Sequence, residues 1–242
     1  MYFKLICCEV FVREACYAIA LSPHVVDVDF TPKGAHEKSQ YLKALIQDKI
    51  NESDGQGYDA ILLGFGLCGN STSGIRAGNT PLIIPRAHDC CTIFLGSRER
   101  FIDHFKDRLS AQWSSAGYLE RGDSRVREAD VSSTLGLDKS FQELVDKYGQ
   151  DNAKYIWETL HPDMSNDEMI FIEVPEFSHL GYKDKMEDEA RKKGKELKVI
   201  QGDMRLIKAL VFGQWTDEEF LTIQPGQSIY PLYDTKSVFQ AK

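Results

Sequence analysis

A short apolar run that stops at a proline constrains the fold of this chain more than any other stretch. Leu82–Ile84 is followed by Pro85 and then at once by a cluster of polar and reactive side chains. Such a run is typical of a strand buried on both faces. The next segment, Thr92–Phe105, has apolar residues near helical spacing. The polar cluster therefore falls between a strand end and a helix start, which is where ligands bind in open α/β sheets.

The same alternation of strand and helix recurs along the first part of the chain. Strands are predicted at 2–7, 25–30 and 58–65, with helices at 9–21 and 35–53 between them. In the first helix, Ala15, Ala18 and Leu21 are expected to face inward and Arg13 and Glu14 outward. This order predicts an α/β fold with a mostly parallel, Rossmann-like sheet and helices on both faces.

The pattern changes in the middle of the chain and then resumes. Residues 109–167 have an aromatic loop containing Trp113 and Tyr118, followed by polar helical stretches, and are predicted to form a helical insertion or cap. Residues 168–242 repeat the order β-α-β-α-β, which allows two similar halves. We therefore expect a first α/β unit at 1–108 with the functional site, the insertion, and a second α/β unit.

Composition excludes several classes of partner. The chain of 242 residues has a net charge of −8 and its Lys and Arg residues are scattered, so no nucleic-acid partner is predicted. No run of about 18 apolar residues occurs, so no membrane span is expected and the protein is predicted to be cytoplasmic. In such a compartment, six cysteines are metal ligands, reactive thiols or core residues more often than disulfides.

Three of the cysteines follow predicted strands. Cys8 comes after the first strand, Cys68 after the third and Cys90 after the fourth. Since the carboxyl ends of parallel strands lie on one edge of a sheet, these sulfurs can meet. With His88 they form a Cys₃His set that suits tetrahedral zinc. Three thiolates alone suit a [4Fe-4S] cluster with one open iron.

A plainer interpretation remains open for these thiols, because unmetallated cysteines are often buried core residues. No local C-x-x-C spacing supports a metal. The position of Cys16 on the inner face of the first helix favours burial, and Cys7 is expected to end the first strand inside the core.

Other residues near these turns suggest binding of an anion. Arg86 and Arg98 can grip a carboxylate or phosphate, although a solvated surface explains Arg98 equally well. Gly66, Gly69 and Asn70 lie in a glycine-rich turn whose N–H groups could cradle an anion. This turn lacks the Lys-Ser/Thr of a P-loop and the spacing of a dinucleotide fingerprint.

Five blocks of the chain are distinctive: Cys8–Phe11, Pro32–His36, Tyr58–Cys68, Ile84–Cys90 and Leu95–Arg100. Together they resemble the bacterial and archaeal family catalogued as domain of unknown function 1638. The family carries no established activity, but its members are similar in setting to accessory proteins of corrinoid-dependent methyltransferases in methylamine and betaine metabolism. The resemblance implies a methyl-transfer context, and it implies that the cysteine before Glu9, the Gly-Leu-Cys turn and the His-Asp-Cys segment are the family's thiol and imidazole positions.

Two hypotheses of function follow. In the first, the chain is a metal-dependent enzyme, such as a transferase or lyase, whose metal acts as a Lewis acid on a small anionic substrate. Glu9 and His36 are then the catalytic candidates, with Glu9 as acid/base, and Arg86 and Arg98 orient the substrate together with His36. In the second, the chain is a non-catalytic or metal-handling partner of a corrinoid protein or methyltransferase, and its cysteine site is structural.

Overall fold

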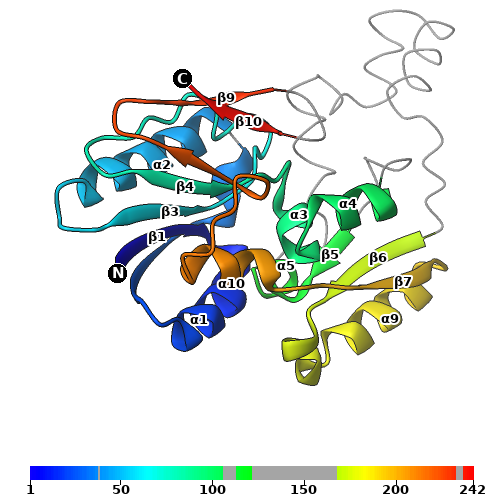
Figure 1. Ribbon diagram of the computed structural model, residues 1–242. Coiled ribbons are helices and arrows are strands. Elements are labelled where there is room, and N and C mark those ends of the chain that lie inside the picture. Colours follow the sequence, from blue (N-terminus) through cyan, green and yellow to red (C-terminus); the bar gives the residue numbers. More distant parts are fainter. Residues whose placement is uncertain (38, 106–112, 122–167, 233–236) are drawn as a thin grey trace, which may run out of the picture.

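The computed structural model describes residues 1–37, 39–105, 113–121, 168–232 and 237–242 (Figure 1). The predicted polar helical stretches between 122 and 167 lie outside these residues, as do the side chains of His36 and Glu37. Within the described part of the chain, no helix is long and apolar enough to cross a membrane.

The central sheet has five strands in the order β2-β1-β3-β4-β8. The first four are parallel, and β8 pairs antiparallel with β4 at one edge. Strands β3 and β4 are buried along their whole length, which explains their nearly unbroken apolar sequence. The bounds are β1 (Tyr2–Cys8), β2 (Val25–Thr31), β3 (Ala60–Gly64), β4 (Leu82–Pro85) and β8 (Phe220–Ile223). The predicted α/β class with a mostly parallel sheet is confirmed.

Helices cover both faces of this sheet (Figure 1). From β1 the chain passes to β2 on one side of it. From β2 the chain then returns past β1 to β3 on the other side. Right-handed connections in opposite directions place their helices on opposite faces. The first helical segment is η1 (Glu9–Phe11) with α1 (Val12–Leu21), and the second is η2 (Lys33–Glu37) with α2 (Ser39–Ser53). Helix α10 (Arg205–Val211) packs beside α1.

A second, three-stranded parallel sheet stands beside the first, in the order β5-β6-β7. Its first strand contains Trp113, so part of the predicted aromatic loop is a strand and the helix that follows it. Helix α9 covers this sheet (Figure 1). The bounds are β5 (Trp113–Ser115), α5 (Ala116–Glu120), β6 (Glu168–Glu173), η3 (Pro175–Leu180), α9 (Tyr182–Lys192) and β7 (Glu196–Gln201).

The last strand of the expected β-α-β-α-β repeat belongs to the other sheet. After β7, helix α10 packs on β3 and β4 of the central sheet. The next strand, β8, is thereby delivered to the free edge of β4, which it pairs in the antiparallel sense. After β8 come two more strands, β9 (Ile229–Pro231) and β10 (Phe239–Ala241), which pair with each other in the antiparallel sense.

Two short helices join the sheets, and the first of them touches both. These are α3 (Cys90–Leu95) and α4 (Arg98–Phe105). All six residues of α3 are buried. The Phe94 carbonyl accepts a hydrogen bond of 2.8 Å from the N–H of Asp203, which follows β7. A Cβ on Gly202 would lie 3.0 Å from the same carbonyl oxygen, so glycine permits this close approach.

The orientation predicted for the first helix is wrong at Glu14 and Leu21, and also at Cys16, which is exposed rather than buried. Glu14 is buried, with 2% of its surface exposed, whereas Leu21 is 55% exposed. The chain makes the 3-10 turn η1 before α1 begins at Val12, and this turn changes which residues face the sheet. Glu14 therefore shares the inner face with Ala15 and Ala18. Its Oε2 has no hydrogen-bond partner in the described structure, and burial raises the pKa of this carboxyl to about 7.

Replacing Glu14 should remove a pH dependence of stability. The folded state holds the Glu14 proton up to about pH 7, whereas the unfolded state releases it near its ordinary pKa of 4.5. The contribution of Glu14 to the free energy of unfolding is therefore fully present below about pH 4.5. It falls by roughly 3 kcal/mol as the pH rises to about 7. We expect Glu14→Gln to match the parent protein in urea unfolding near pH 5 and to exceed it at pH 8.

The exposed Glu52 of α2 provides the matched control. Glu52→Gln should change the unfolding free energy by less than about 0.5 kcal/mol at both pH values. A Glu14→Gln protein that is less stable than the parent at pH 8 would contradict the assignment of a raised pKa.

Candidate functional site

The paired loops beyond the strands bring three cysteines to one place. Cys8 is the last residue of β1, and β1 lies beside β3. Beyond β3 and β4 the chain stays paired, since the N–H of Leu67 donates to the Ala87 carbonyl and the N–H of Cys68 to the His88 carbonyl, both at 2.9 Å. This pairing holds Cys68 next to the segment that starts α3 at Cys90.

The cluster lies at the point where the connections of the sheet change direction. The strand order β2-β1-β3 sends one crossover to each side of β1, so the loops after β1 and β3 diverge. Ligands of doubly wound sheets bind in the crevice at such a switch point, outside the carboxyl ends of the strands. The general rule for α/β folds therefore points to the same loops as the cysteines do.

The loop that holds Cys68 has an unusual backbone. Cys68, Gly69 and Asn70 all have positive φ, at 46°, 60° and 69°. A non-glycine residue in this region costs of order 1 kcal/mol or more and persists where the surroundings fix it, often at functional sites. The two pairings described above and the bond from the Ser71 hydroxyl to the Cys68 carbonyl, 2.8 Å long, fix this turn.

The thiol of Cys90 contacts the thiols of both other cysteines. Hydrogen bonding with Cys68, then with Cys8, and burial raise the pKa of Cys90 well above its ordinary value. The pKa of Tyr118 is also well above its usual range, and burial is the largest cause. The charges of Cys90, Cys8 and Cys68 raise it further, as does a hydrogen bond with Cys90. The Tyr118 hydroxyl therefore belongs to the cluster, which we call the thiol cluster: Cys8, Cys68, Cys90 and Tyr118.

Aromatic rings shield the thiol cluster. Phe94 of α3 lies 4.4 Å from Phe11 and 6.2 Å from Tyr118 between ring centroids, and Trp113 lies 5.0 Å from Tyr118. Gly117 allows α5 to approach η1 closely, because a Cβ there would overlap the Val10 carbonyl. The second sheet thus supplies one wall of a site whose thiols come from the first sheet. Cys68 alone among the three cysteines is partly exposed.

The other predicted site residues have different surroundings. The His88 ring packs 6.2 Å from the Phe101 ring of α4. One Glu9 oxygen accepts a 2.7 Å bond from the N–H of Lys33, and the other lies 3.7 Å from Arg121. Glu9 thus binds two neighbouring segments together. Gly66 permits a close approach of the two loops, whereas Gly69 and Asn70 are exposed.

Cys7 and Cys16 are not among the thiols that contact Cys90, and Cys91 is buried beside it in the chain. The described residues include all six, and none is in a disulfide. Cys7 is buried against Gly64 and donates to its carbonyl at 3.6 Å, and Cys16 is exposed rather than buried as its helix face predicted. Within the described chain, no group of three or more His, Cys, Asp or Glu side chains could hold a metal ion in its present arrangement.

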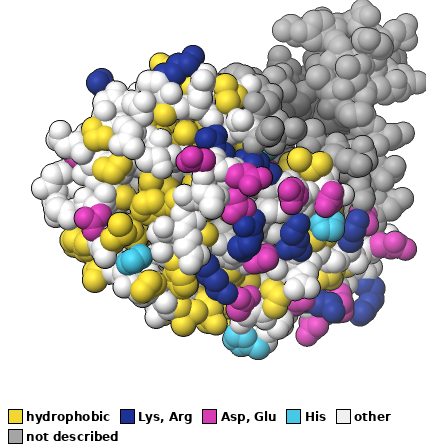
Figure 2. All heavy atoms as spheres, viewed as in Figure 1, with side chains coloured by type: hydrophobic (Ala, Val, Ile, Leu, Met, Phe, Trp, Pro, Cys, Tyr) yellow, Lys and Arg dark blue, Asp and Glu magenta, His cyan; other side chains and the backbone are white. Residues whose placement is uncertain are grey.

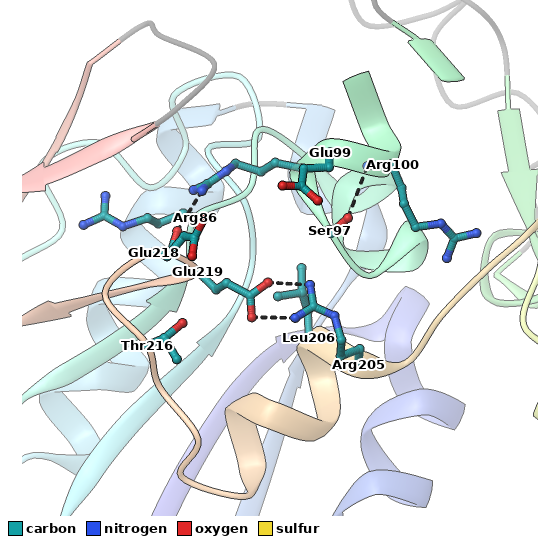
Figure 3. Close-up of a pocket in the computed structure, with 10 residues that line it drawn as sticks. Arg86, Ser97, Glu99, Arg100, Arg205, Leu206, Thr216, Glu218 and Glu219 are labelled. Carbon is teal, nitrogen blue, oxygen red and sulfur yellow. Dashed lines mark hydrogen bonds and ion pairs between the residues drawn. The ribbon is translucent and has the colours of Figure 1, made fainter. Parts of the chain in front are cut away.

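The predicted anion-binding arginines lie in a separate cavity of about 530 Å³ (Figure 3). Arg86 and Arg98 line it, but none of the thiol cluster does. Sequence reasoning missed the partners that complete it, which are Arg205 of α10 and Glu218 and Glu219 before β8. These residues follow Arg86 by more than a hundred positions, and no spacing in the sequence connects them. In Figure 2, side chains of both charges gather on the face seen there.

Comparison with known proteins identifies the family. The family described as "Protein of unknown function (DUF1638)" matches residues 30–211. The chain belongs to the DUF1638 family. No curated protein and no solved structure matches it. In this DUF1638 protein, Cys68, His88 and Cys90 lie within the matched residues, whereas Cys8 precedes them.

The close approach at Gly66 generates a test of the loop pairing. A Cβ on Gly66 would lie 2.7 Å from the Asp89 nitrogen and 2.9 Å from the Ala87 oxygen. Since both are backbone atoms, Gly66→Ala must push the two loops of the DUF1638 protein apart. We expect a loss of about 1–3 kcal/mol in urea unfolding.

Gly34 is a suitable control, because a Cβ there would meet nothing within 4 Å. Gly34→Ala should leave the free energy of unfolding unchanged or raise it slightly. Equal stability of the two variants would show that the loops do not depend on the contact at Gly66.

Proposed function

We propose that Cys8, Cys68 and Cys90 bind a metal ion, with zinc as the preferred metal, and that this centre acts on a small anionic molecule. The observation that carries the proposal is the contact of the Cys90 thiol with the thiols of Cys68 and Cys8, which follow other strands of the sheet. Buried cysteines usually pack as separate small apolar groups. Three that converge at the switch point of a sheet, one of them on a strained turn, support a ligand-binding role.

The direct contact of the thiols favours a single ion over a cluster. Two sulfurs that share a tetrahedral zinc are roughly 3.8 Å apart, because each Zn–S bond is about 2.3 Å. The contacts of Cys90 with two thiols bring the sulfurs toward such an arrangement, and the side chains would have to move to surround an ion. A [4Fe-4S] cluster needs space between the sulfurs for four irons and four sulfides, and the strand ends would have to separate to admit it.

Charge gives a second reason for a cation. Each thiolate formed in this buried group makes the next one harder to form, and a bound divalent ion removes that obstacle by compensating the charges. A tetrahedral metal would have a fourth coordination position. His88, two residues from Cys90, could fill it, or water or a substrate atom could. Tyr118, which hydrogen-bonds with Cys90, would hold or donate a proton beside a bound metal.

The function that fits such a centre is a metal-dependent step in one-carbon or methyl-transfer metabolism in the cytoplasm. With its open position, the metal would supply Lewis-acid chemistry. Glu9, fixed by Lys33 and Arg121, would position the end of β1, and His36 stays a candidate. We also propose that the sheets are two Rossmann-like halves. The second candidate is a non-catalytic accessory partner of a corrinoid protein or methyltransferase, and the buried cluster behind its aromatic wall is the observation that favours this structural use.

Metal analysis of matched cysteine variants tests the proposal. The parent protein, purified without oxygen, should contain about one zinc ion per chain, and Cys90→Ser should contain almost none. The exposed Cys16 provides the control, since Cys16→Ser should keep its zinc. His88→Ala should lose affinity for zinc if the imidazole is the fourth ligand and retain it if water is.

Two results would sink the zinc assignment. Iron and sulfide in equal amounts, retained in His88→Ala, would show a three-cysteine cluster. A parent protein that binds neither metal after incubation with zinc or with iron and sulfide would show that the thiols are only core residues.

A further inference from the structure

The cavity that contains Arg98 has the properties of a second, separate ligand site. Its volume of about 530 Å³ is in the range that small-molecule sites occupy. Its walls come from the loop after β4, from α4, from α10 and from the segment before β8 (Figure 3). Because four distant segments converge there, the cavity is part of the folded architecture and not a gap in one loop.

Arg98 offers a hydrogen-bond donor that none of the described residues uses. Its Nη2 donates to the Glu218 carbonyl at 2.7 Å, which fixes the guanidinium. Its Nη1 is buried and has no hydrogen-bond partner in the described structure. An unsatisfied buried donor costs about 1–3 kcal/mol, and more when it is charged. A bound acceptor that reaches Nη1 would recover this free energy.

The other arginines of the cavity are held in different ways. Arg205 forms a two-bond ion pair with Glu219, one bond of which is 2.6 Å, and so its charge is neutralised. Arg86 instead donates to backbone carbonyls, those of Asp217 at 2.8 Å and Ser237 at 2.6 Å among them. These hydrogen bonds hold the Arg86 guanidinium in place, as the bond to the Glu218 carbonyl does for Arg98.

We propose that this cavity, which Arg86 also lines, binds the anionic group of a small ligand, a phosphate or a carboxylate, through Arg98 Nη1. Planar guanidinium groups match both oxyanions. Glu99 and Glu218, which also line the cavity, repel additional negative charge and so select a ligand with one anionic group. The inference deepens the proposed function, on which it rests for the idea of an anionic substrate, but the site itself is distinct from the thiol cluster.

Helix α3 relates the two sites in space. It begins at Cys90 and ends at Leu95, a length of about 9 Å. The carbonyl of Leu95 accepts a bond of 2.8 Å from Arg100, and that of Gly96 accepts one of 2.8 Å from Arg205. Both arginines line the cavity. A ligand anchored at Arg98 thus lies near the far end of the helix that carries Cys90.

Calorimetric titration of the whole protein with inorganic phosphate and, separately, with lactate tests the proposal. We expect one of the two to bind and Arg98→Met to weaken that binding at least about tenfold, the value of one charge-assisted hydrogen bond. Arg98→Lys should bind the anion with an affinity between those of the parent protein and Arg98→Met. Lysine keeps the positive charge but lacks the planar guanidinium group. Glu99→Gln should strengthen binding about twofold to fivefold by removing a nearby negative charge.

Arg191 provides the matched control, since its side chain is 78% exposed and far along the chain on α9. Arg191→Met should bind as the parent does. Binding of phosphate identifies a phosphate ligand and binding of lactate a carboxylate ligand. If neither anion binds, or if Arg98→Met binds as tightly as the parent, the proposal is wrong.

Zinc content of the same variants separates this proposal from the previous one. Arg98→Met should keep its zinc and lose the anion, whereas Cys90→Ser should lose its zinc and keep the anion. Loss of anion binding in Cys90→Ser, with its fold intact by circular dichroism, would show one composite site in place of two.

Discussion

The backbone pairing of the loops after β3 and β4 is the constraint on which the rest of the site depends. Parallel strands usually diverge into their loops once the ladder ends, but here Leu67 and Cys68 continue to donate to carbonyls of the neighbouring loop. Gly66 makes this possible, because a side chain there would collide with the backbone of that loop. Without the pairing, Cys68 would have no reason to remain beside Cys90, and the positive φ of Cys68 would have no support.

The first half of the fold could be predicted from the sequence because local patterns determine it. Unbroken apolar runs such as Leu82–Pro85 belong to strands buried on both faces, and the parallel edge rule then places the residues after them together. Cys8, Cys68 and Cys90 could therefore be selected from six cysteines without a structure. The sequence predicts an aromatic segment containing Tyr118 but not its contact with these thiols. That contact requires the second sheet to pack against η1.

Other features of the fold depend on packing between distant segments, which the periodicity of apolar residues in the sequence does not reveal. The phase of α1 shifts because a 3-10 turn precedes it, and this shift buries Glu14 where an outward position was expected. The return of β8 to the first sheet follows from the packing of α10, not from any property of Phe220–Ile223. The pairing of Arg205 with Glu219 and their approach to Arg98 likewise arise only when that return is made. Sequence could nominate Arg98, but it could not find the cavity.

The shortness of α3 has a consequence for how this protein opens. A helix of six residues is far below the length at which helices are stable in isolation, so its own hydrogen bonds do not maintain it. It persists because Asp89 caps its start, Gly96 ends it, and both sheets bury it. Local unfolding of this one segment would release Cys90 at one end and the carbonyl anchors of Arg100 and Arg205 at the other. Opening of this short helix would therefore disturb the surroundings of the thiols and of the arginines together, although the two sites share no residue.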